Sequence, residues 1–207
     1  MSGGRPRDPE IDAAVLTATV AVLCESGYAG FAVEKVAARA GTTKAAMRRR
    51  WPVRQRLIID ALATLLATPP APDNGCTRCD LIDSVRLLAE VLHDRLPRGV
   101  LAPLIADCAD DAELHEHLLA VLVQPSRQAA TIAVRRAAER GDLRADVDPG
   151  LLVDMLASVV YQRALFGEAP IGRSSVRPLV DVVLRGVAVD FERLVKVSEA
   201  ADRRHQH

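Results

Sequence analysis

Aromatic residues are scarce in this chain of 207 residues, where Phe, Tyr and Trp together make up 3% of the sequence. This scarcity argues against a site for a flat, stacked ligand and favours an aliphatic or small amphipathic one. The sequence contains no run of eighteen apolar residues, so we expect no membrane-spanning segment. The N-terminus is charged and lacks an apolar signal region, so we expect a cytoplasmic protein.

Motifs of catalysis are also missing. The sequence has no Gly-rich phosphate loop, no serine nucleophile elbow and no His-Glu-x-x-His motif. Paired acids such as Asp110-Asp111 are common at helix starts and do not by themselves indicate chemistry. We therefore expect neither an enzyme nor a bound cofactor.

The chain has only four cysteines, Cys24, Cys76, Cys79 and Cys108. Two of them have the Cys-x-x-Cys spacing of a redox or half-zinc motif, but a full zinc site needs four ligands and no second pair exists. We favour a chance spacing of idle thiols, with a thiol switch as the alternative. The histidines at 93, 115 and 117 are interpreted as solvated side chains rather than metal ligands.

The net charge is zero, with 27 basic and 27 acidic residues, but the charges are unevenly distributed. No acid lies between positions 35 and 56, a stretch that holds eight basic residues: Lys35, Arg39, Lys44, Arg48, Arg49, Arg50, Arg54 and Arg56. Conversely, positions 101–126 hold five acids and no Lys or Arg. A concentrated basic patch in a neutral protein suggests a local site for a polyanion, although a solvated helix face is the alternative.

Glycine and proline number only 12 each, and the abundant Ala, Leu and Arg favour helix, so we expect an all-α protein. Apolar periodicity and capping residues predict helices over 8–26, 32–40, 42–51 and 53–67. A Pro-rich loop follows over 68–75, and five more helices are expected over 77–95, 99–107, 111–140, 149–166 and 176–196. We expect the third of these five to be broken near Pro125.

The segment 33–51 has the pattern of a helix-turn-helix. Ala37 is small where two helices must cross closely, and Gly41 can adopt the positive φ of the tight turn. Val33, Val36, Ala40 and Met47 would form the buried face. The second helix would then lie in the major groove of DNA, and the residues expected to contact DNA are Thr42, Thr43, Lys44, Ala45, Arg48, Arg49, Arg50 and Arg54. A purely structural helical hairpin is the alternative.

Three segments carry a specific order and spacing: Gly27-Tyr28, VEKVAARAG at 33–41 and TTKAAMRRRWP at 42–52. Together they resemble the TetR/AcrR family of bacterial transcriptional repressors, over about residues 9–60. GDLRADVDP at 141–149 and LRG at 184–186 resemble one subgroup more loosely. The chain departs from the family where Ala32 replaces a capping Thr, where Arg48 replaces Tyr, and where Val53 follows Pro52 in place of a capping Ser.

The resemblance implies an N-terminal three-helix DNA-binding domain over 1–55 and a C-terminal helical bundle over 56–198 for effector binding and dimerisation. A polar tail over 199–207 is expected to be disordered. The implied function is a homodimeric repressor that binds a palindromic double-stranded DNA operator and is released by an unidentified small-molecule effector. The alternative is a helical thiol- or metal-responsive sensor or scaffold without DNA binding.

Two further sets of residues are expected from the apolar faces of the C-terminal helices. The dimer interface is expected to comprise Leu152, Met155, Leu156, Val159, Val160, Arg163, Leu179, Val180, Val183, Leu184 and Val187. An apolar effector cavity of about 300 Å³ or more is expected between the middle helices. Its residues would be Leu62, Leu66, Val85, Leu88, Leu92, His93, Leu104, Asp107, Cys108, Leu119, Val123, Met155 and Gln162. Ordinary core packing is the alternative for both sets.

Overall fold

The computed structural model describes residues 9–66, 70–167 and 169–204. Within these ranges all the regular elements are helices, as the sequence predicts, with one isolated β-bridge between Leu143 and Ala188. None of the described helices is both long and apolar enough to cross a membrane. The described residues form two compact units, one made of 9–66 and 96–122 and the other of 70–95, 123–167 and 169–204.

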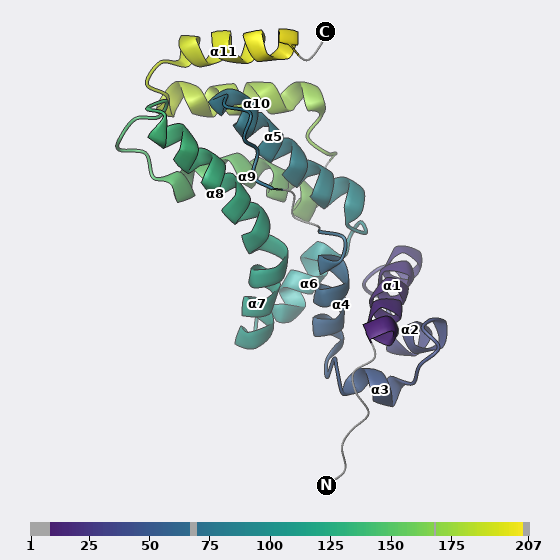
Figure 1. Cartoon of the computed structure of the whole chain (residues 1–207). Coiled ribbons are helices and arrows are strands. Elements are labelled where there is room, and N and C mark those ends of the chain that lie inside the picture. Colours follow the sequence, from purple (N-terminus) through teal and green to yellow (C-terminus); the bar gives the residue numbers. More distant parts are fainter. Residues whose placement is uncertain (1–8, 67–69, 168, 205–207) are drawn as a thin grey trace. The chain divides into compact units, whose positions relative to one another are not determined.

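The first unit is built around helix α4. Its helices are α1 (Pro9–Ser26), α2 (Val33–Arg39), α3 (Lys44–Arg48), α4 (Arg54–Ala63), α6 (Leu101–Cys108) and α7 (Ala112–Leu118) (Figure 1). Helix α4 packs against α1, α6 and α7 and buries five of its ten residues, namely Leu57, Ile58, Ile59, Ala61 and Leu62. The structure thus groups residues differently from the expected division at residue 55, because α4, α6 and α7 belong to the same unit as the helix-turn-helix.

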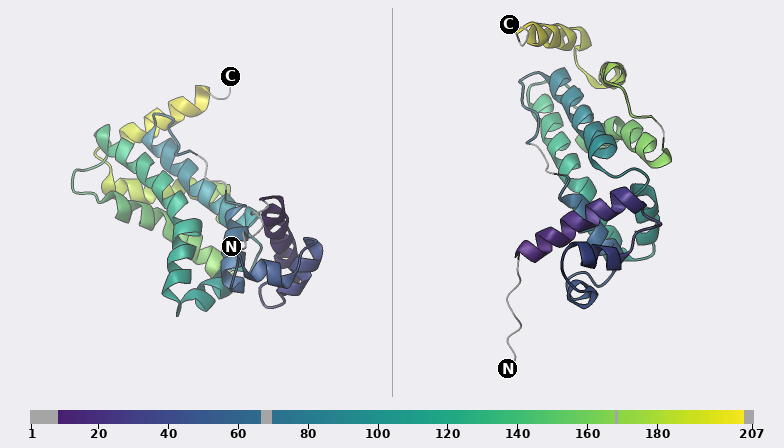
Figure 2. Two further views of the ribbon diagram at one scale, coloured as in Figure 1. Left: turned by 60° about the horizontal axis from the view of Figure 1, so that its bottom comes forward. Right: turned by 90° about the vertical axis from the view of Figure 1, so that its right-hand side faces the viewer.

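The second unit is built around helix α5. Its elements are α5 (Thr77–Glu90), the π-helix η1 (Val91–Arg95), α8 (Gln124–Glu139), α9 (Pro149–Phe166), α10 (Arg173–Val187) and α11 (Phe191–Arg204). Helix α5 contacts all four of the other α-helices and lies alongside α8 (Figures 1 and 2). The buried core includes Leu81, Val85, Val134, Leu152, Leu156, Val160, Val180, Leu184 and Leu194.

One of the expected helices is wrong as a single element, and two others contain π-helical segments. The helix expected over 176–196 is wrong as a single element, because residue 188 is extended and forms the bridge to Leu143, and Asp190 then caps α11 by accepting a hydrogen bond from the Arg193 N–H at 2.9 Å. The helix expected over 77–95 ends in η1. The break expected near Pro125 in the helix over 111–140 is confirmed, because the second π-helix, η2 (Leu119–Val123), separates α7 from α8 there.

The C-terminal tail and the Cys-x-x-Cys pair also differ from expectation. Helix α11 continues to Arg204, because Ser198 and Ala201 are buried. The last three residues of the expected tail lie outside the described residues. Cys76 and Cys79 are joined by a disulfide rather than being idle thiols, whereas Cys24 is an exposed and Cys108 a buried free thiol.

Candidate nucleic-acid interface

Helices α2 and α3 form the predicted helix-turn-helix. Gly41 has a φ of +63°, which a residue with a Cβ rarely adopts, and the N–H of Thr42 donates to the carbonyl of Ala37 at 3.0 Å to close the turn. Val36 and Met47 hold the two helices together through side chains that are almost fully buried. The turn is confirmed as the sequence predicts, and the predicted buried face is confirmed in part, because Val33 and Ala40 are only half-buried.

Among the helices α2, α3 and α4, only α3 has an N-cap side chain that forms a hydrogen bond. Thr43 caps α3, since its Oγ1 accepts the N–H of Ala46 at 3.1 Å. Ala32 and Val53 stand at the N-caps of α2 and α4 and provide no side-chain hydrogen bond, as their chemistry predicts. The first turns of α2 and α4 therefore lack the side-chain acceptor that a Thr or Ser would supply.

Six of the eight basic side chains contact a partner outside the basic segment. Four arginines form ion pairs: Arg39 with Glu25 at 2.8 Å, Arg50 with Asp12 at 2.7 Å, Arg54 with Asp107 at 2.8 Å and Arg56 with Glu113 at 3.1 Å. Lys44 pairs with Glu34, and Lys35 donates to the Ser26 hydroxyl at 3.4 Å. Among the described residues, Arg48 and Arg49 form no ion pair, and both are exposed. The structure thereby distinguishes two arginines that the sequence could not rank.

Asp107 brings together the start of α4 and the segment after α1. Its Oδ2 accepts the Tyr28 hydroxyl at 2.7 Å and the Arg54 guanidinium at 2.8 Å, and that guanidinium lies 5.0 Å from the centre of the Tyr28 ring. The hydrogen bonds from Tyr28 and Arg54 lower the pKa of Asp107. Burial and the contact with Asp107 raise the pKa of Tyr28, so the phenol stays protonated and donates.

A second polar chain anchors the segment that follows α3. Trp51, which is 9% exposed, donates from Nε1 to Asp60 at 2.8 Å, and the other carboxylate oxygen of Asp60 lies 2.6 Å from Nε2 of His117. His117 is therefore a half-buried partner of α4, not the solvated side chain that we expected. In the part of the chain that the structure describes, no three His, Cys, Asp or Glu side chains converge to form a metal site.

A cleft of about 300 Å³ lies beside α2, α3 and α4 within the first unit. Charged side chains on its wall are Glu34, Lys44, Arg48 and Arg54, and Phe31, Met47 and Trp51 also line it. The cleft thus joins the uncapped starts of α2 and α4 to the exposed face of α3. Phosphate groups are bound in proteins by this combination of cationic side chains and main-chain N–H groups.

The residues expected to line an effector cavity do not come together as one set. Leu62, Leu104 and Cys108 are fully buried in the core of the first unit, and Leu66 and Leu119 are half-buried there. Asp107 is committed to Tyr28 and Arg54. In the second unit, Leu92 packs against the core, and the Nε2 atom of His93 is buried and without a hydrogen-bond partner among the described residues. Met155 is 48% exposed, and Gln162 is also exposed.

The second unit does contain a cavity, formed by α5, η1, α8 and α9. Its volume is about 100 Å³, a third of what we expected. Val85, Leu88 and Val123 are the expected residues that line it. Sequence reasoning missed its polar residues, Ser84, Ser126, Arg127, Asp154 and Tyr161, and the covering Pro70 and Pro72. These polar residues lie on three helices, α5, α8 and α9, so no local pattern in the sequence groups them.

The expected dimer face needs a similar correction. Leu152, Leu156, Val160, Val180, Val183 and Leu184 are 9% exposed or less and form the core of a single chain. Val159, Leu179 and Val187 are half-buried against that core, and Arg163 donates to the carbonyl of Ala169 at 3.0 Å. The exposed apolar residues of α9 and α10 are instead Leu151, Met155, Phe166 and Val182. Of the expected set, Met155 alone belongs to this exposed group.

Comparisons with known proteins decide the family. Residues 71–183 match the family described as "Tetracyclin repressor-like, C-terminal domain". The chain belongs to the TetR family. Members of this family are DNA-binding transcriptional regulators and not enzymes, and they form homodimers.

Relatives of this TetR-family regulator match along most of its length. It is 30% identical over 185 residues to the uncharacterized HTH-type transcriptional regulator YdeS of Bacillus subtilis, covering 89% of this chain and 93% of the relative. It is also 30% identical over 174 residues to a DNA-binding transcriptional repressor TetR of Mycobacteroides abscessus, covering 83% and 90%. Among solved structures, the TetR-family transcription regulator SCO0332 matches with a TM-score of 0.67 and 32% identity, over 86% of this chain and 98% of that one.

The Asp107 cluster predicts how the stability of the first unit depends on pH. Since the pKa of Asp107 is lowered in the native state, its contribution is present above the ordinary value of 3.8 and is lost as pH falls through the lowered pKa. Asp107→Asn should therefore melt at a lower temperature than the parent at pH 7, with the difference shrinking below pH 3.8. Thermal melts over a pH series measure this. Asp110→Asn, at an exposed neighbour, is the control, and equal melting of the Asp107 variant and the parent at pH 7 would contradict the assignment.

Proposed function

We propose that this chain is a homodimeric repressor that binds a palindromic operator in the cytoplasm and is released by a small-molecule effector. The observation that carries the proposal is the exposure of Arg48, the last residue of α3, and of its C-cap residue Arg49. Neither forms an ion pair among the described residues, while carboxylates or a hydroxyl hold the other six basic side chains. Two cations on the second helix of a helix-turn-helix are positioned for the major groove.

The remaining expected contact residues divide into two roles. Thr42, Lys44 and Ala45 stand at the start of α3, where side chains of a recognition helix contact base edges. Lys44 and Arg54 form ion pairs that are about half exposed, and such pairs are weak enough to exchange their carboxylate for a phosphate. Arg50 and Thr43 have structural partners, Asp12 and the Ala46 N–H, so their contribution to DNA binding is through positioning.

The arginines of α3 predict a change in salt dependence. Each phosphate contact contributes about 0.9 to the magnitude of the negative slope of log K against log salt concentration. The dimer carries two copies of Arg48, so Arg48→Gln should reduce that magnitude by about 1.8. The operator is first obtained by selecting bound genomic fragments, and affinity is then measured by fluorescence anisotropy over a salt series. Arg135→Gln, an exposed charge of α8 in the second unit, is the matched control. An unchanged slope for both Arg48→Gln and Arg49→Gln would refute the proposed interface.

The dimer interface is proposed on the exposed apolar side of α9 and α10. Leu151 is 61% exposed, Met155 48% and Val182 71%, and the two α9 residues are separated by four positions and so share one face of the helix. Exposed apolar side chains that share one face of a helix are typical of a protein interface. A two-fold axis through this surface would pair α9 and α10 with their copies and place two recognition helices on half-sites about 34–36 Å apart, or a multiple of that distance.

Substitutions at two neighbouring valines of α10 distinguish the proposed interface from the core. Val182→Asp should give a folded monomer, because it places a charge in the proposed interface, whereas Val183→Asp should unfold the second unit, because Val183 is buried. Sedimentation velocity and circular dichroism measure the two outcomes. Ile132→Asp, at a residue of α8 that is 44% exposed, is the control and should remain dimeric. A dimeric Val182→Asp protein would place the interface elsewhere.

The effector is proposed to occupy the cavity of the second unit. Its walls include Val85, Leu88 and Leu156, and its polar side carries Tyr161 and the Arg127–Asp154 pair, which is joined by contacts of 2.8 and 3.0 Å. The paired charges cancel, and burial raises the pKa of Tyr161, so its hydroxyl remains neutral. A volume of about 100 Å³ accommodates a short aliphatic group, since an engineered cavity of about 150 Å³ binds benzene.

These features indicate a small amphipathic effector with a neutral hydrogen-bonding end. A metabolite screen by thermal stabilisation should find one, since a ligand at about a hundred times its Kd adds about 2.7 kcal/mol. Ala157→Leu, which fills the cavity, should abolish that stabilisation and leave DNA binding intact, whereas Ala138→Leu on the exposed side of α8 should change neither. A ligand that stabilises the Ala157→Leu protein as strongly as the parent would show that it binds elsewhere.

A further inference from the structure

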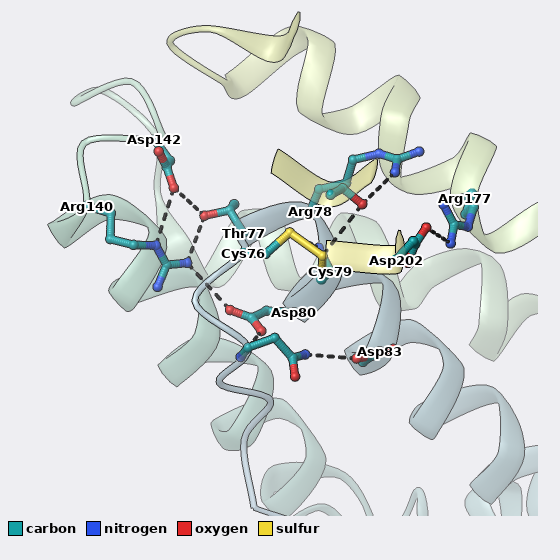
Figure 3. The surroundings of a disulfide bond; sticks show 12 residues. Cys76, Thr77, Arg78, Cys79, Asp80, Asp83, Arg140, Asp142, Arg177 and Asp202 are labelled. Atoms are coloured by element: carbon teal, nitrogen blue, oxygen red, sulfur yellow. Dashed lines mark hydrogen bonds and ion pairs between the residues drawn. A yellow bond between two sulfur atoms is a disulfide. The ribbon is translucent and has the colours of Figure 1, made fainter. Parts of the chain in front are cut away.

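The disulfide lies in the first turn of α5 (Figure 3). Cys76 is the N-cap residue of the helix, and its Sγ accepts the N–H of Cys79 at 3.2 Å. The two Cα atoms are 5.2 Å apart, so the pair can be joined without a large rearrangement of the backbone. A thiolate at a helix N-terminus is stabilised by the main-chain N–H groups and the helix dipole, which makes Cys76 a good leaving group when the bond is broken.

The two sulfur atoms differ in accessibility. Cys76 is only 3% exposed, whereas Cys79 is half-buried and its Sγ lies 3.6 Å from the Ser198 hydroxyl of α11. An external thiol therefore reaches Cys79 first. This division, with one accessible sulfur and one stabilised leaving group, is what thiol–disulfide exchange requires of a reactive pair.

The residues between the cysteines connect the first turn of α5 to other parts of the second unit. Arg78 donates two hydrogen bonds to Asp181 of α10, at 2.7 and 2.9 Å, and a third to Ser198 of α11 at 2.9 Å. Thr77 donates to Asp142 at 2.6 Å on the opposite side (Figure 3). The disulfide thus encloses the arginine that holds α10 and α11 on α5.

We propose that Cys76 and Cys79 form a reversible redox site whose reaction partners are low-molecular-weight thiols and their disulfides. In reduction, a thiolate attacks Sγ of Cys79, the bond between the cysteines breaks, and its electron pair leaves on Sγ of Cys76. A second thiolate then attacks the external sulfur of the mixed disulfide and releases Cys79. In total, two external thiols are oxidised to one disulfide, and the protein disulfide is reduced to two thiols by two electrons.

The state of the pair changes how firmly Arg78 is held. The closed ring restricts the first turn of α5 and therefore the geometry in which the guanidinium contacts Asp181 and Ser198. Reduction removes this restraint and loosens α10 and α11. An effect on the dimer would follow through Val182 of α10 and rests on the proposed function, whereas the redox reaction and the local loosening do not, so the two can fail separately.

The redox reaction is tested on the full chain carrying Cys24→Ser, which removes the exposed free thiol. The protein is equilibrated in anaerobic buffers of graded reduced-to-oxidised glutathione ratio, quenched with acid, alkylated after denaturation and mapped by mass spectrometry. We expect Cys76 and Cys79 to gain the alkyl label together, in one transition reached from either starting state. A pair that keeps one state across the series, or that stops at a glutathione adduct of Cys79, overturns the proposal.

The local consequence is tested by amide hydrogen exchange of the same protein in its oxidised and reduced states. Exchange in α10 and α11 should rise by up to about tenfold on reduction. Cys76→Ser is the matched control, because serine keeps the N-cap while the disulfide is lost, and it should exchange at the reduced rate in both buffers. Equal exchange of the oxidised and reduced parent protein would overturn the link between the pair and these helices, whether or not the variant folds.

Discussion

The packing of α4 is the contact on which the first unit depends. A ten-residue helix with five buried residues has apolar neighbours on several sides, and here α1, α6 and α7 supply them. The same helix carries Asp60, which holds Trp51, three residues after the end of α3, and is itself held by His117. The orientation of α3 is therefore set by α4 and its partners as much as by the turn at Gly41.

Charge complementarity within the first unit explains how a neutral protein presents a basic surface. The sequence separates a basic segment from an acidic one, and the fold brings Arg54 against Asp107 and Arg56 against Glu113. These pairs are partly exposed and contribute little to stability individually. Their larger effect is on which cations can bind a polyanion. The carboxylates neutralise Arg54 and Arg56, whereas Arg48 at the end of α3 has no such partner among the described residues.

The second unit relies on a buried polar cluster as well as on its apolar core. Arg78 is 6% exposed and pairs with Asp181, and the fully buried Asp80 has its pKa raised by burial, which the Asn74 N–H and the Arg140 guanidinium partly offset. Breaking one partner of a buried charge pair is costly because the other charge is left without water. The first turn of α5 therefore carries buried charges that depend on the positions of their partners. A covalent bond across this turn restricts those positions.

The sequence by itself determined the helices with strong punctuation and the helix-turn-helix, because apolar period, Gly41 and the caps are local properties of the chain. It also located the basic segment. Only the tertiary structure decided which arginines form ion pairs and which do not. The carboxylates that pair with Arg54 and Arg56 lie 53 and 57 positions away in the sequence, so the sequence cannot show these contacts. Likewise, an apolar helix such as α9 has two apolar sides, and only packing assigns Leu152 to the core and leaves Leu151 exposed, because burial depends on contacts between helices distant in sequence.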